Sequence, residues 1–226
     1  TVSVPVNLHT VGSTHWFGDV WLNADNDRID IMWVESTGGG GTLFDIKHKR
    51  STDGGSTFSS TTSALSGIAQ PRNTMLEVHT SNSGTGSDKI HFIYTDDNSG
   101  ELYWVGSQDG SATWITVAGK EGTTGTLISN NGLHAQFIDE PTLTVDGNTI
   151  YVVYYTQDDQ DTFVYQLFMV KSSNHGTSWT DPVRVTNAGY VYNDRLIPYL
   201  YVNPSNSNEL IVFYNDESNG IIENES

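Results

Sequence analysis

Residues 140–159 read EPTLTVDGNTIYVVYYTQDD. A short strand, EPTLTV, leads into a D-G-N turn, and the turn leads into a second strand rich in β-branched and aromatic residues. Asp, Gly and Asn suit a tight hairpin turn because they tolerate positive φ and bond to their own backbone. A nearly continuous apolar strand indicates burial on both faces, as in stacked sheets.

The second strand of this hairpin recurs four times along the chain, each time ending in an aromatic residue and a polar or acidic turn. The copies are IDIMWVES (29–36), KIHFIYTDD (89–97), TIYVVYYTQDD (149–159) and ELIVFYNDES (209–218). With Trp33, Tyr94, Tyr155 and Tyr214 as markers, successive copies lie 61, 61 and 59 residues apart. A fixed period of this length is typical of a repeat architecture.

Each repeat also contains a third and a fourth strand, which makes it an up-and-down sheet of four strands. After the third marker these are DTFVYQLFMVK (161–171) and DPVRVTN (181–187). No segment keeps a 3.6-residue apolar period without Gly, Pro or a run of β-branched residues, so we expect almost no helix. The predicted fold class is all-β.

Three similar eight-residue segments, 51–58, 107–114 and 172–179, separate the third strand of a repeat from the fourth. We call them the box turns. In each, a carboxylate or amide accepts backbone N–H groups, a glycine takes the left-handed conformation and an aromatic residue packs against the sheet. The second turn has Ser111 in place of Gly, and the third has Asn174 in place of Asp. The residues with this predicted structural role are Ser51, Asp53, Gly55, Phe58, Ser107, Asp109, Trp114, Ser172, Asn174, Gly176 and Trp179.

The box turns resemble the Asp boxes of bacterial neuraminidase (BNR) repeats in sialidase-like β-propellers. The phrases EPTLTVDGNTIYVVYYTQDD and SWTDPVRVTN are similar to blade sequences of secreted proteins with such repeats. The resemblance implies a β-propeller of about four four-stranded antiparallel blades. It also implies that the Asp boxes, between third and fourth strands, lie on the rim away from the ligand.

The chain is predicted to form one propeller domain, residues 1–226. Within it we expect an outer strand at 1–12, blades at 13–66, 67–120 and 121–188, and an incomplete blade at 189–226. Either the N-terminal strand completes the last blade beside GIIENES and closes a small ring, or the chain is part of a larger or shared propeller. An unclosed end would expose strand edges and favour assembly with other chains, so a homo-oligomer is possible.

The composition excludes several classes of partner. Ten Lys and Arg stand against 27 Asp and Glu, for a net charge of -17, and such a surface repels nucleic acid and anionic membranes. No run approaches the roughly 20 apolar residues of a membrane span. The absence of cysteine excludes disulfides and thiolate metal sites, and the Gly-rich, Tyr- and Trp-rich composition favours an extracellular or cell-surface protein.

Candidate catalytic residues lie in the loops that precede the first strands of the repeats, which share one face of a propeller. They are Arg72, Asp139, Glu140 and Arg195. The sialidase resemblance implies arginines that clamp a carboxylate, an Asp acid/base and a Tyr activated by Glu. Only Arg72 and Arg195 lie in these loops, so a full arginine triad is not visible, and Arg195-Leu196-Ile197-Pro198 has one residue more than the Arg-Ile-Pro signature. The carboxylates have a second interpretation as solvated or turn-capping groups.

Candidate ligand-binding residues in the same loops are His15, Trp16, Asp19, Tyr192 and Asp194. Aromatic rings such as Trp16, Tyr190 and Tyr192 match the flat faces of sugars, although they equally suit packing. No cofactor is expected, and no spacing indicates a metal site. The acidic runs Asp96-Asp97-Asn98, Asp158-Asp159 with Asp161, and Asp216-Glu217 offer oxygen ligands that Ca²⁺ prefers, but none has an EF-hand order.

Three functions remain open from the sequence. The preferred one is an exported propeller module that binds glycans or associates with other extracellular chains. The alternatives are an exo-glycosidase of sialidase type and a structural unit of an extracellular assembly.

Overall fold

The computed structural model describes residues 15–23, 27–36, 43–68, 71–79, 88–96, 99–110, 113–115, 125–129, 138–158, 161–186, 197–203, 209–216 and 220–225. All regular structure in these ranges is β-strand, as predicted. Within them, no helix has the length and apolar character that crossing a membrane requires.

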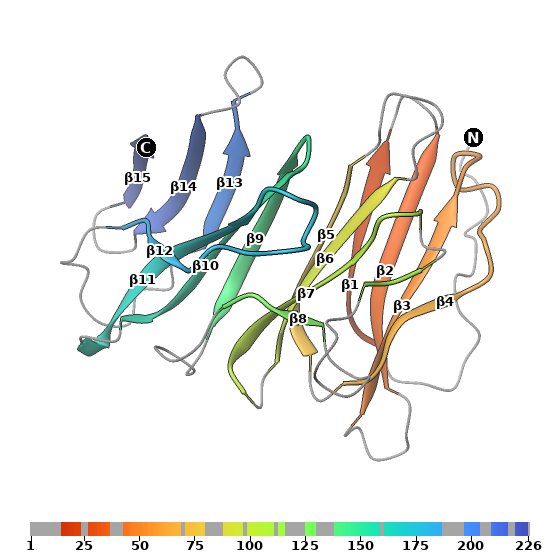
Figure 1. The fold of residues 1–226 in the computed structure, drawn as a ribbon, viewed down its shortest axis with the longest axis horizontal. Helices are drawn as coiled ribbons and strands as arrows, with labels where there is room; N and C mark the ends of the chain where they lie inside the picture. The colour runs from red at the N-terminus through yellow and green to blue at the C-terminus, as the bar shows by residue number, and fades with distance from the viewer. Residues whose placement is uncertain are drawn as a thin grey trace.

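The strands form four antiparallel sheets in chain order (Figure 1). The first sheet is β1 (His15–Asn23), β2 (Arg28–Ser36), β3 (Phe44–Ser51) and β4 (Thr62–Ile68). The second is β5 (Pro71–His79), β6 (Lys89–Asp96), β7 (Glu101–Ser107) and β8 (Thr126–Leu127). The third is β9 (Asp139–Asp146), β10 (Thr149–Asp158), β11 (Asp161–Ser172) and β12 (Val183–Arg184). The fourth is β13 (Pro198–Val202), β14 (Leu210–Asp216) and β15 (Gly220–Glu225).

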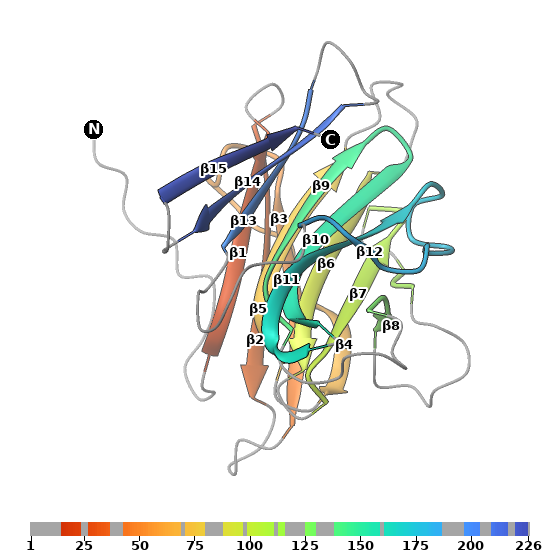
Figure 2. The same ribbon diagram turned by 90° about the vertical axis from the view of Figure 1, so that its left-hand side faces the viewer.

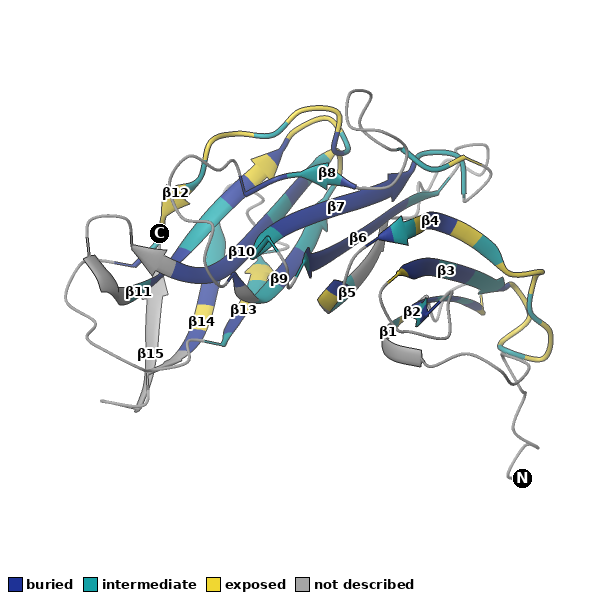
Figure 3. Cartoon of the chain, turned by 90° about the horizontal axis from the view of Figure 1, so that it is seen from below, coloured by how far each residue is buried: buried dark blue, intermediate teal, exposed yellow. Residues whose placement is uncertain are grey.

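The sheets stack as an arc around their first strands. Strand β5 packs between β1 and β9, and β9 packs between β5 and β13, so the four first strands form an inner row. Seen from below, the fourth strands β4, β8 and β12 follow the opposite side of the arc (Figure 3). The first and fourth sheets lie at the two ends of the stack (Figure 1), and no close packing joins them among the described residues. The expected outer strand at 1–12 lies outside the described residues.

The core consists of three apolar layers, one between each pair of neighbouring sheets. Because adjacent residues of a strand point to opposite faces, each middle strand supplies both layers beside it. The first layer includes Met32, Val34, Phe44, Ile90, Phe92 and Tyr94, the second Ile93, Trp104, Ile150, Val152 and Tyr154, and the third Val153, Tyr155, Leu167, Val212 and Tyr214. This two-sided burial explains why the marker strands lack alternation.

The structurally equivalent aromatic of the third repeat is Tyr154, not the predicted Tyr155. Tyr94, Tyr154 and Tyr214 each face the preceding sheet, whereas Tyr155 faces the following one. The register agrees, because the residue four positions before Trp33, Tyr94 or Tyr154 pairs with the first serine of a box turn in every case. With Tyr154 as the marker, the copies lie 61, 60 and 60 residues apart.

The second repeat extends beyond the predicted boundary at residue 120. Its fourth strand starts just after Trp114, where Ile115 pairs with Gly106, but the longer pairing comes later, where Leu127 lies opposite Tyr103. A fourth strand of two residues leaves no apolar run for sequence analysis to find. The first repeat likewise ends with β4 at Ile68, two residues after the predicted boundary at 66.

Candidate functional site

The first strands β1, β5 and β9 share a bulge near their N-terminal ends. In β5, Arg72 pairs with Thr95 and Met75 with Ile93, so two residues of β5 oppose Tyr94 alone. Strand β9 repeats this between Asp139 and Thr142, and β1 between His15 and Gly18. Bulges redirect side chains and are common beside binding sites, so these three ends form the candidate site.

The register places two predicted residues, Arg72 and Asp139, at equivalent positions. Arg72 lies opposite the residue after Tyr94, and Asp139 lies opposite the residue after Tyr154. Because β5 and β9 pack against each other, a cationic and an acidic residue stand at the same level of neighbouring inner strands. Figure 2 shows β1, β5 and β9 running together along this inner side. Arg72 is exposed, as a ligand-binding cation must be.

Glu140, the neighbour of Asp139, adopts a left-handed backbone conformation with a φ of 45°. For a residue other than glycine this conformation costs about 1–2 kcal/mol. Such outliers cluster at functional sites, where the surrounding structure holds them in place. The bulge also means that simple alternation along β9, which would send Asp139 and Glu140 to opposite faces, does not apply here.

The other predicted residues fare differently. Asp19 lies opposite Met32, further along its strand than Asp139 lies along β9, so the two aspartates are not at equivalent positions. Asp19 Oδ1 accepts a hydrogen bond from the Val20 N–H at 2.8 Å. His15 and Trp16 belong to the bulged end of β1. Tyr190, Tyr192, Asp194 and Arg195 lie outside the described residues.

A tyrosine–glutamate pair is present, but it does not resemble an activated nucleophile. Tyr103 donates a hydrogen bond from its hydroxyl to Glu101 Oε2 at 2.5 Å. Burial, together with this hydrogen bond to Glu101, raises the pKa of Tyr103 above its ordinary value. A phenolate nucleophile needs the opposite shift, and the pair lies on the third strand β7, away from the inner row.

The box turns occupy the opposite ends of the strands, between third and fourth strands as predicted. In the first, Asp53 Oδ1 accepts the Thr57 N–H at 2.9 Å and Asp53 Oδ2 accepts the Thr57 hydroxyl at 2.6 Å. The second turn repeats these bonds between Asp109 and Thr113 at 2.8 and 2.6 Å. The two bonds from each threonine lower the pKa of each carboxyl to about 2. These carboxylates are committed to their own turns.

The aromatic residues of the second and third box turns pack against the preceding sheet. Trp114 meets His48 of β3 edge-on, with ring centroids 5.4 Å apart. Trp179 meets Trp104 of β7 in the same manner at 5.9 Å. Each turn therefore joins two sheets in addition to closing its own hairpin.

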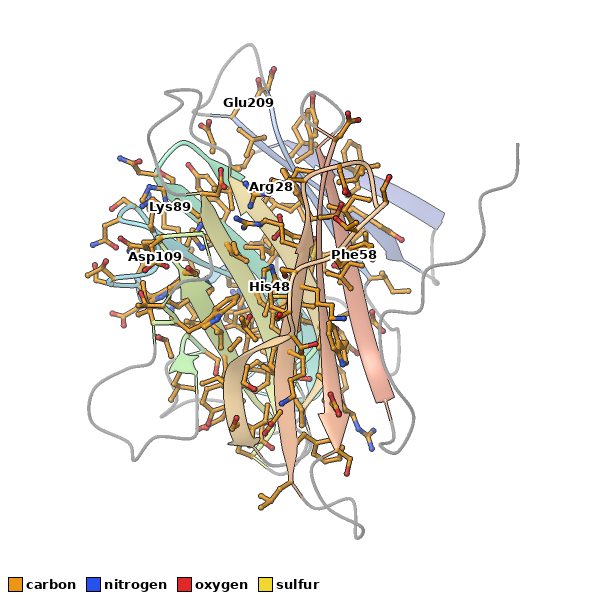
Figure 4. All side chains as sticks on the ribbon, turned by 90° about the vertical axis from the view of Figure 1, so that its right-hand side faces the viewer. Arg28, His48, Phe58, Lys89, Asp109 and Glu209 are labelled. Atoms are coloured by element: carbon orange, nitrogen blue, oxygen red, sulfur yellow. The ribbon has the colours of Figure 1, made fainter. Side chains whose placement is uncertain are left out.

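A buried charge cluster joins the first and second sheets, and sequence analysis did not find it. Asp30 of β2 is fully buried and accepts hydrogen bonds from Arg28 Nε at 2.7 Å, His48 Nε2 at 2.7 Å and Arg50 Nε at 2.8 Å. Both arginines also pair with Asp88, which precedes β6. Figure 4 looks onto the first sheet and marks Arg28 and His48.

The net effect on Asp30 keeps it ionised. Burial raises the pKa of Asp30. The hydrogen bond from His48 and the charges of Arg50 and Arg28 together lower it by more, so the pKa lies below its ordinary value. An aspartate inside the apolar strand IDIMWVES, two residues after Arg28, together with His48 and Arg50 two residues apart in β3, was the available signal. The cluster lies toward the box-turn ends of β2 and β3, so we assign it a structural role.

Among the described residues, no three His, Asp or Glu side chains converge to hold a metal ion. Of the acidic runs considered for Ca²⁺, Asp97, Asn98, Asp159 and Glu217 lie outside the described residues.

Four-stranded antiparallel sheets stacked around an inner row of first strands define the chain as a β-propeller protein of the architecture found in glycoside hydrolases. An α-L-arabinofuranosidase from Fusarium graminearum, solved with an iminosugar inhibitor, is similar with a TM-score of 0.57 and 17% identity over 93% of this chain and 61% of that one. An α-L-arabinanase from Penicillium chrysogenum, solved with arabinobiose, gives 0.54 and 16% over 93% and 60%. A Hadza microbial sialidase gives 0.53 and 15% over 93% and 44%.

The chain thus spans about three fifths of the length of the arabinofuranosidase and the arabinanase. At these identities the likeness establishes the fold. No protein-family model and no curated protein matches the sequence.

Proposed function

We propose that this chain is an exported or cell-surface β-propeller module that binds glycans over the N-terminal ends of β1, β5 and β9. The observation that carries the proposal is the equivalent placement of Arg72 and Asp139 on two inner strands that pack together, each beside a bulge. A guanidinium fork donates to sugar hydroxyls or a carboxylate, and a carboxylate accepts from hydroxyls, so the two residues suit a polyhydroxylated ligand.

Three further observations support a glycan as ligand. The box turns resemble those of sialidase-like proteins, and the fold is shared with an arabinanase solved with arabinobiose. The net charge of -17 makes nucleic acid a poor partner. The composition, rich in Gly, Tyr and Trp, suits an exported module.

Titration calorimetry with arabinobiose and with a sialyl-lactose probe tests this proposal. We expect binding of one of these two sugars, with a loss of about tenfold or more in Arg72→Ala and in Asp139→Asn, because each removes a charge-assisted hydrogen bond. Asp146→Asn is the matched control, since it changes the same strand at its other end, in a turn where Asn is well tolerated. Failure of both sugars to bind, or equal binding by all three variants, would contradict the proposal.

A second candidate is an exo-glycoside hydrolase, which the left-handed Glu140 beside Asp139 favours. Retaining and inverting glycosidases both need two carboxyl groups near the scissile bond. In this variant of the proposal Glu140 or Asp139 is the acid/base, and Arg72, with Arg195, holds the substrate.

Hydrolysis of aryl α-L-arabinofuranoside and aryl sialoside separates the enzyme from the binding module. An enzyme would lose about 10²–10⁴-fold in kcat in Glu140→Gln while still binding the sugar, because the amide cannot transfer the proton. Sugar binding without turnover in the unmodified protein excludes the hydrolase for these substrates and leaves the binding module.

A further inference from the structure

A methionine sulfur joins two of the bulged strands that form the candidate site. Met75 Sδ on β5 accepts a hydrogen bond from the backbone N–H of Leu143 on β9 at 3.1 Å. Strand β9 is the edge strand of its sheet, so no strand of that sheet lies on its free side. Leu143 is 1% exposed, and a buried N–H of this kind needs an acceptor within the protein. The thioether of the neighbouring sheet is that acceptor.

This hydrogen bond lies directly beside the bulges of both strands. Regular pairing of β5 with β6 resumes at Met75, after the bulge that follows Arg72. Regular pairing of β9 with β10 resumes at Thr142, one residue before Leu143 and after the bulge that follows Asp139. Met75 also packs against the second apolar layer, which restrains its sulfur. The bond therefore holds β5 against β9 at the point where each strand departs toward its site residue.

The three methionines of the chain differ in exposure and in place. Met32 is fully buried in the first apolar layer. Met169 is half-buried, as Met75 is, but it lies on β11 opposite Val183 of the outer strand β12. Met75 alone of the three combines partial exposure with a place on an inner strand. The chain has no cysteine, so a peroxide reacts chiefly with methionine sulfur.

We propose that Met75 is a positioning residue of the candidate site and that its oxidation by a peroxide weakens glycan binding. This inference rests on the proposed glycan-binding function. In the reaction, two electrons pass from the sulfur to the O–O bond of hydrogen peroxide, the bond breaks, one oxygen atom joins the sulfur and the other leaves as water. The product is methionine sulfoxide, which methionine sulfoxide reductases convert back to methionine.

Oxidation changes both contacts of the Met75 side chain. A sulfoxide accepts hydrogen bonds through its oxygen and not through its sulfur, so the Leu143 N–H loses its acceptor at the present position. A sulfoxide is also polar, which no longer suits the apolar layer on which Met75 packs. The two strands then shift relative to each other, and Arg72 and Asp139 are no longer held at the same level.

Met75→Leu tests the hydrogen bond in the absence of any sugar. Leucine has a similar volume to methionine but no acceptor atom. Amide hydrogen exchange followed by NMR should show the Leu143 N–H exchanging at least about tenfold faster in this variant than in the unmodified protein, because its protecting bond is lost. Met169→Leu is the matched control, and it should leave the exchange of Leu143 unchanged. Unchanged exchange in Met75→Leu would overturn the positioning role.

Hydrogen peroxide tests the effect of oxidation on binding. Calorimetry with arabinobiose and with the sialyl-lactose probe should show binding about tenfold weaker after treatment, once mass spectrometry confirms the sulfoxide at Met75. Met169→Leu should lose affinity on treatment as the unmodified protein does, and a sulfoxide reductase should restore it. Met75→Leu should bind weakly from the start and lose no further affinity. The binding stoichiometry should stay constant throughout, which separates a displaced site from unfolded protein.

The outcomes distinguish this inference from the function on which it rests. If the unmodified protein binds neither sugar, the proposed function fails, and the role of Met75 in binding fails with it. If the unmodified protein binds a sugar and keeps its affinity with Met75 oxidised, the proposed function stands and this inference is overturned. A further loss of affinity on treatment of Met75→Leu would assign the effect of peroxide to another residue and would also overturn it.

Discussion

At the third box turn, Asn174 replaces the aspartate of the first two turns without loss of hydrogen bonds. Its Oδ1 accepts the Ser178 N–H at 2.9 Å, and its Nδ2 donates to the Ser178 hydroxyl at 2.8 Å, whereas Asp53 accepts both bonds from Thr57. The turn therefore requires an acceptor at one side-chain atom and any hydrogen-bonding group at the other. The box turn therefore forms without a charged side chain, but only a carboxylate makes its stability depend on pH.

The first two box turns should lose stability in acid, and the third should not. The pKa of Asp53 and of Asp109 is lowered in the folded protein to about 2 from an ordinary value of 3.8, so the unfolded chain binds protons first as pH falls. Their contribution is complete above pH 4 and is lost as pH falls toward 2. We expect the melting temperature of the double variant Asp53→Asn with Asp109→Asn to fall less steeply between pH 4 and pH 2 than that of the unmodified protein. Parallel melting curves for the two proteins would contradict this assignment.

Gly176 has two reasons to be glycine, and Gly55 at the equivalent position has only one. Both have a φ of +86°, but a Cβ on Gly176 would approach Trp104 Cη2 at 2.3 Å, whereas a Cβ on Gly55 would meet only Ile29 Cδ1 at 3.2 Å. The backbone alone costs an alanine about 1–2 kcal/mol. Displacing the buried indole adds about 1–3 kcal/mol.

We therefore expect Gly176→Ala to lower the free energy of unfolding by about 1–3 kcal/mol more than Gly55→Ala does, measured by urea denaturation. The pair is matched because the backbone conformation is the same in both. Equal losses would show that Trp104 can move aside at no cost.

Adjacent tyrosines show where residue-level prediction from sequence ends. Tyr154 and Tyr155 both follow an apolar run, and the spacing alone allowed either as the repeat marker. Only packing distinguishes them, because Tyr154 faces the second sheet and Tyr155 the fourth. A one-residue change in register exchanges the two faces of a strand, so the choice depends on contacts between repeats.

Among the elements, strands β2 and β3 carry a buried charge cluster that includes arginines, an aspartate and a histidine. Asp30 is fully buried and neutralises Arg28 and Arg50 while it accepts a third bond from His48. Because both arginines also reach Asp88 beside β6, the cluster fixes the first sheet against the second.

Asp30→Asn should destabilise the protein by about 3–5 kcal/mol, because it removes the fully buried counter-charge of Arg28 and Arg50 and leaves Asp88 alone to pair with both arginines. The control Asp45→Asn should cost about 1 kcal/mol, since Asp45 has a single charged partner, Lys47, and keeps an oxygen for the Gly67 N–H. Equilibrium denaturation of both variants measures the difference. Similar losses in the two would mean that the cluster around Asp30 contributes no more than an ordinary pair.

Strand order and the places of the box turns were predictable because their signals are local and repeated every sixty residues. The end of the second sheet was not, because its fourth strand pairs at Thr126 and Leu127, well after the second box turn. The charge cluster was also missed, since its members come from three separate strands or turns and only the packing of two sheets brings them together.

At the scale of the whole molecule, sequence analysis named residues of the candidate site but did not predict how they are placed relative to one another. Arg72, Asp139 and Glu140 were found from their place before the first strands of repeats. Their equivalence depends on bulges in β5 and β9 that insert one extra residue each, and a bulge has no sequence signature in these strands. The left-handed Glu140 likewise follows from pairing and not from local preference.

The stack of sheets predicts a gradient of local stability along the arc. The second and third sheets are covered on both faces, whereas the first and fourth each expose one apolar face. In a repeat architecture, each unit is stabilised mainly by its neighbours, so units with one neighbour open more readily. Amide hydrogen exchange in dilute solution should therefore be slowest in β6 and β10 and faster in β2 and β14, the corresponding strands of the end sheets. Uniform exchange across all four strands at low concentration would contradict the gradient, and it would mean that the sheets unfold together as one cooperative unit.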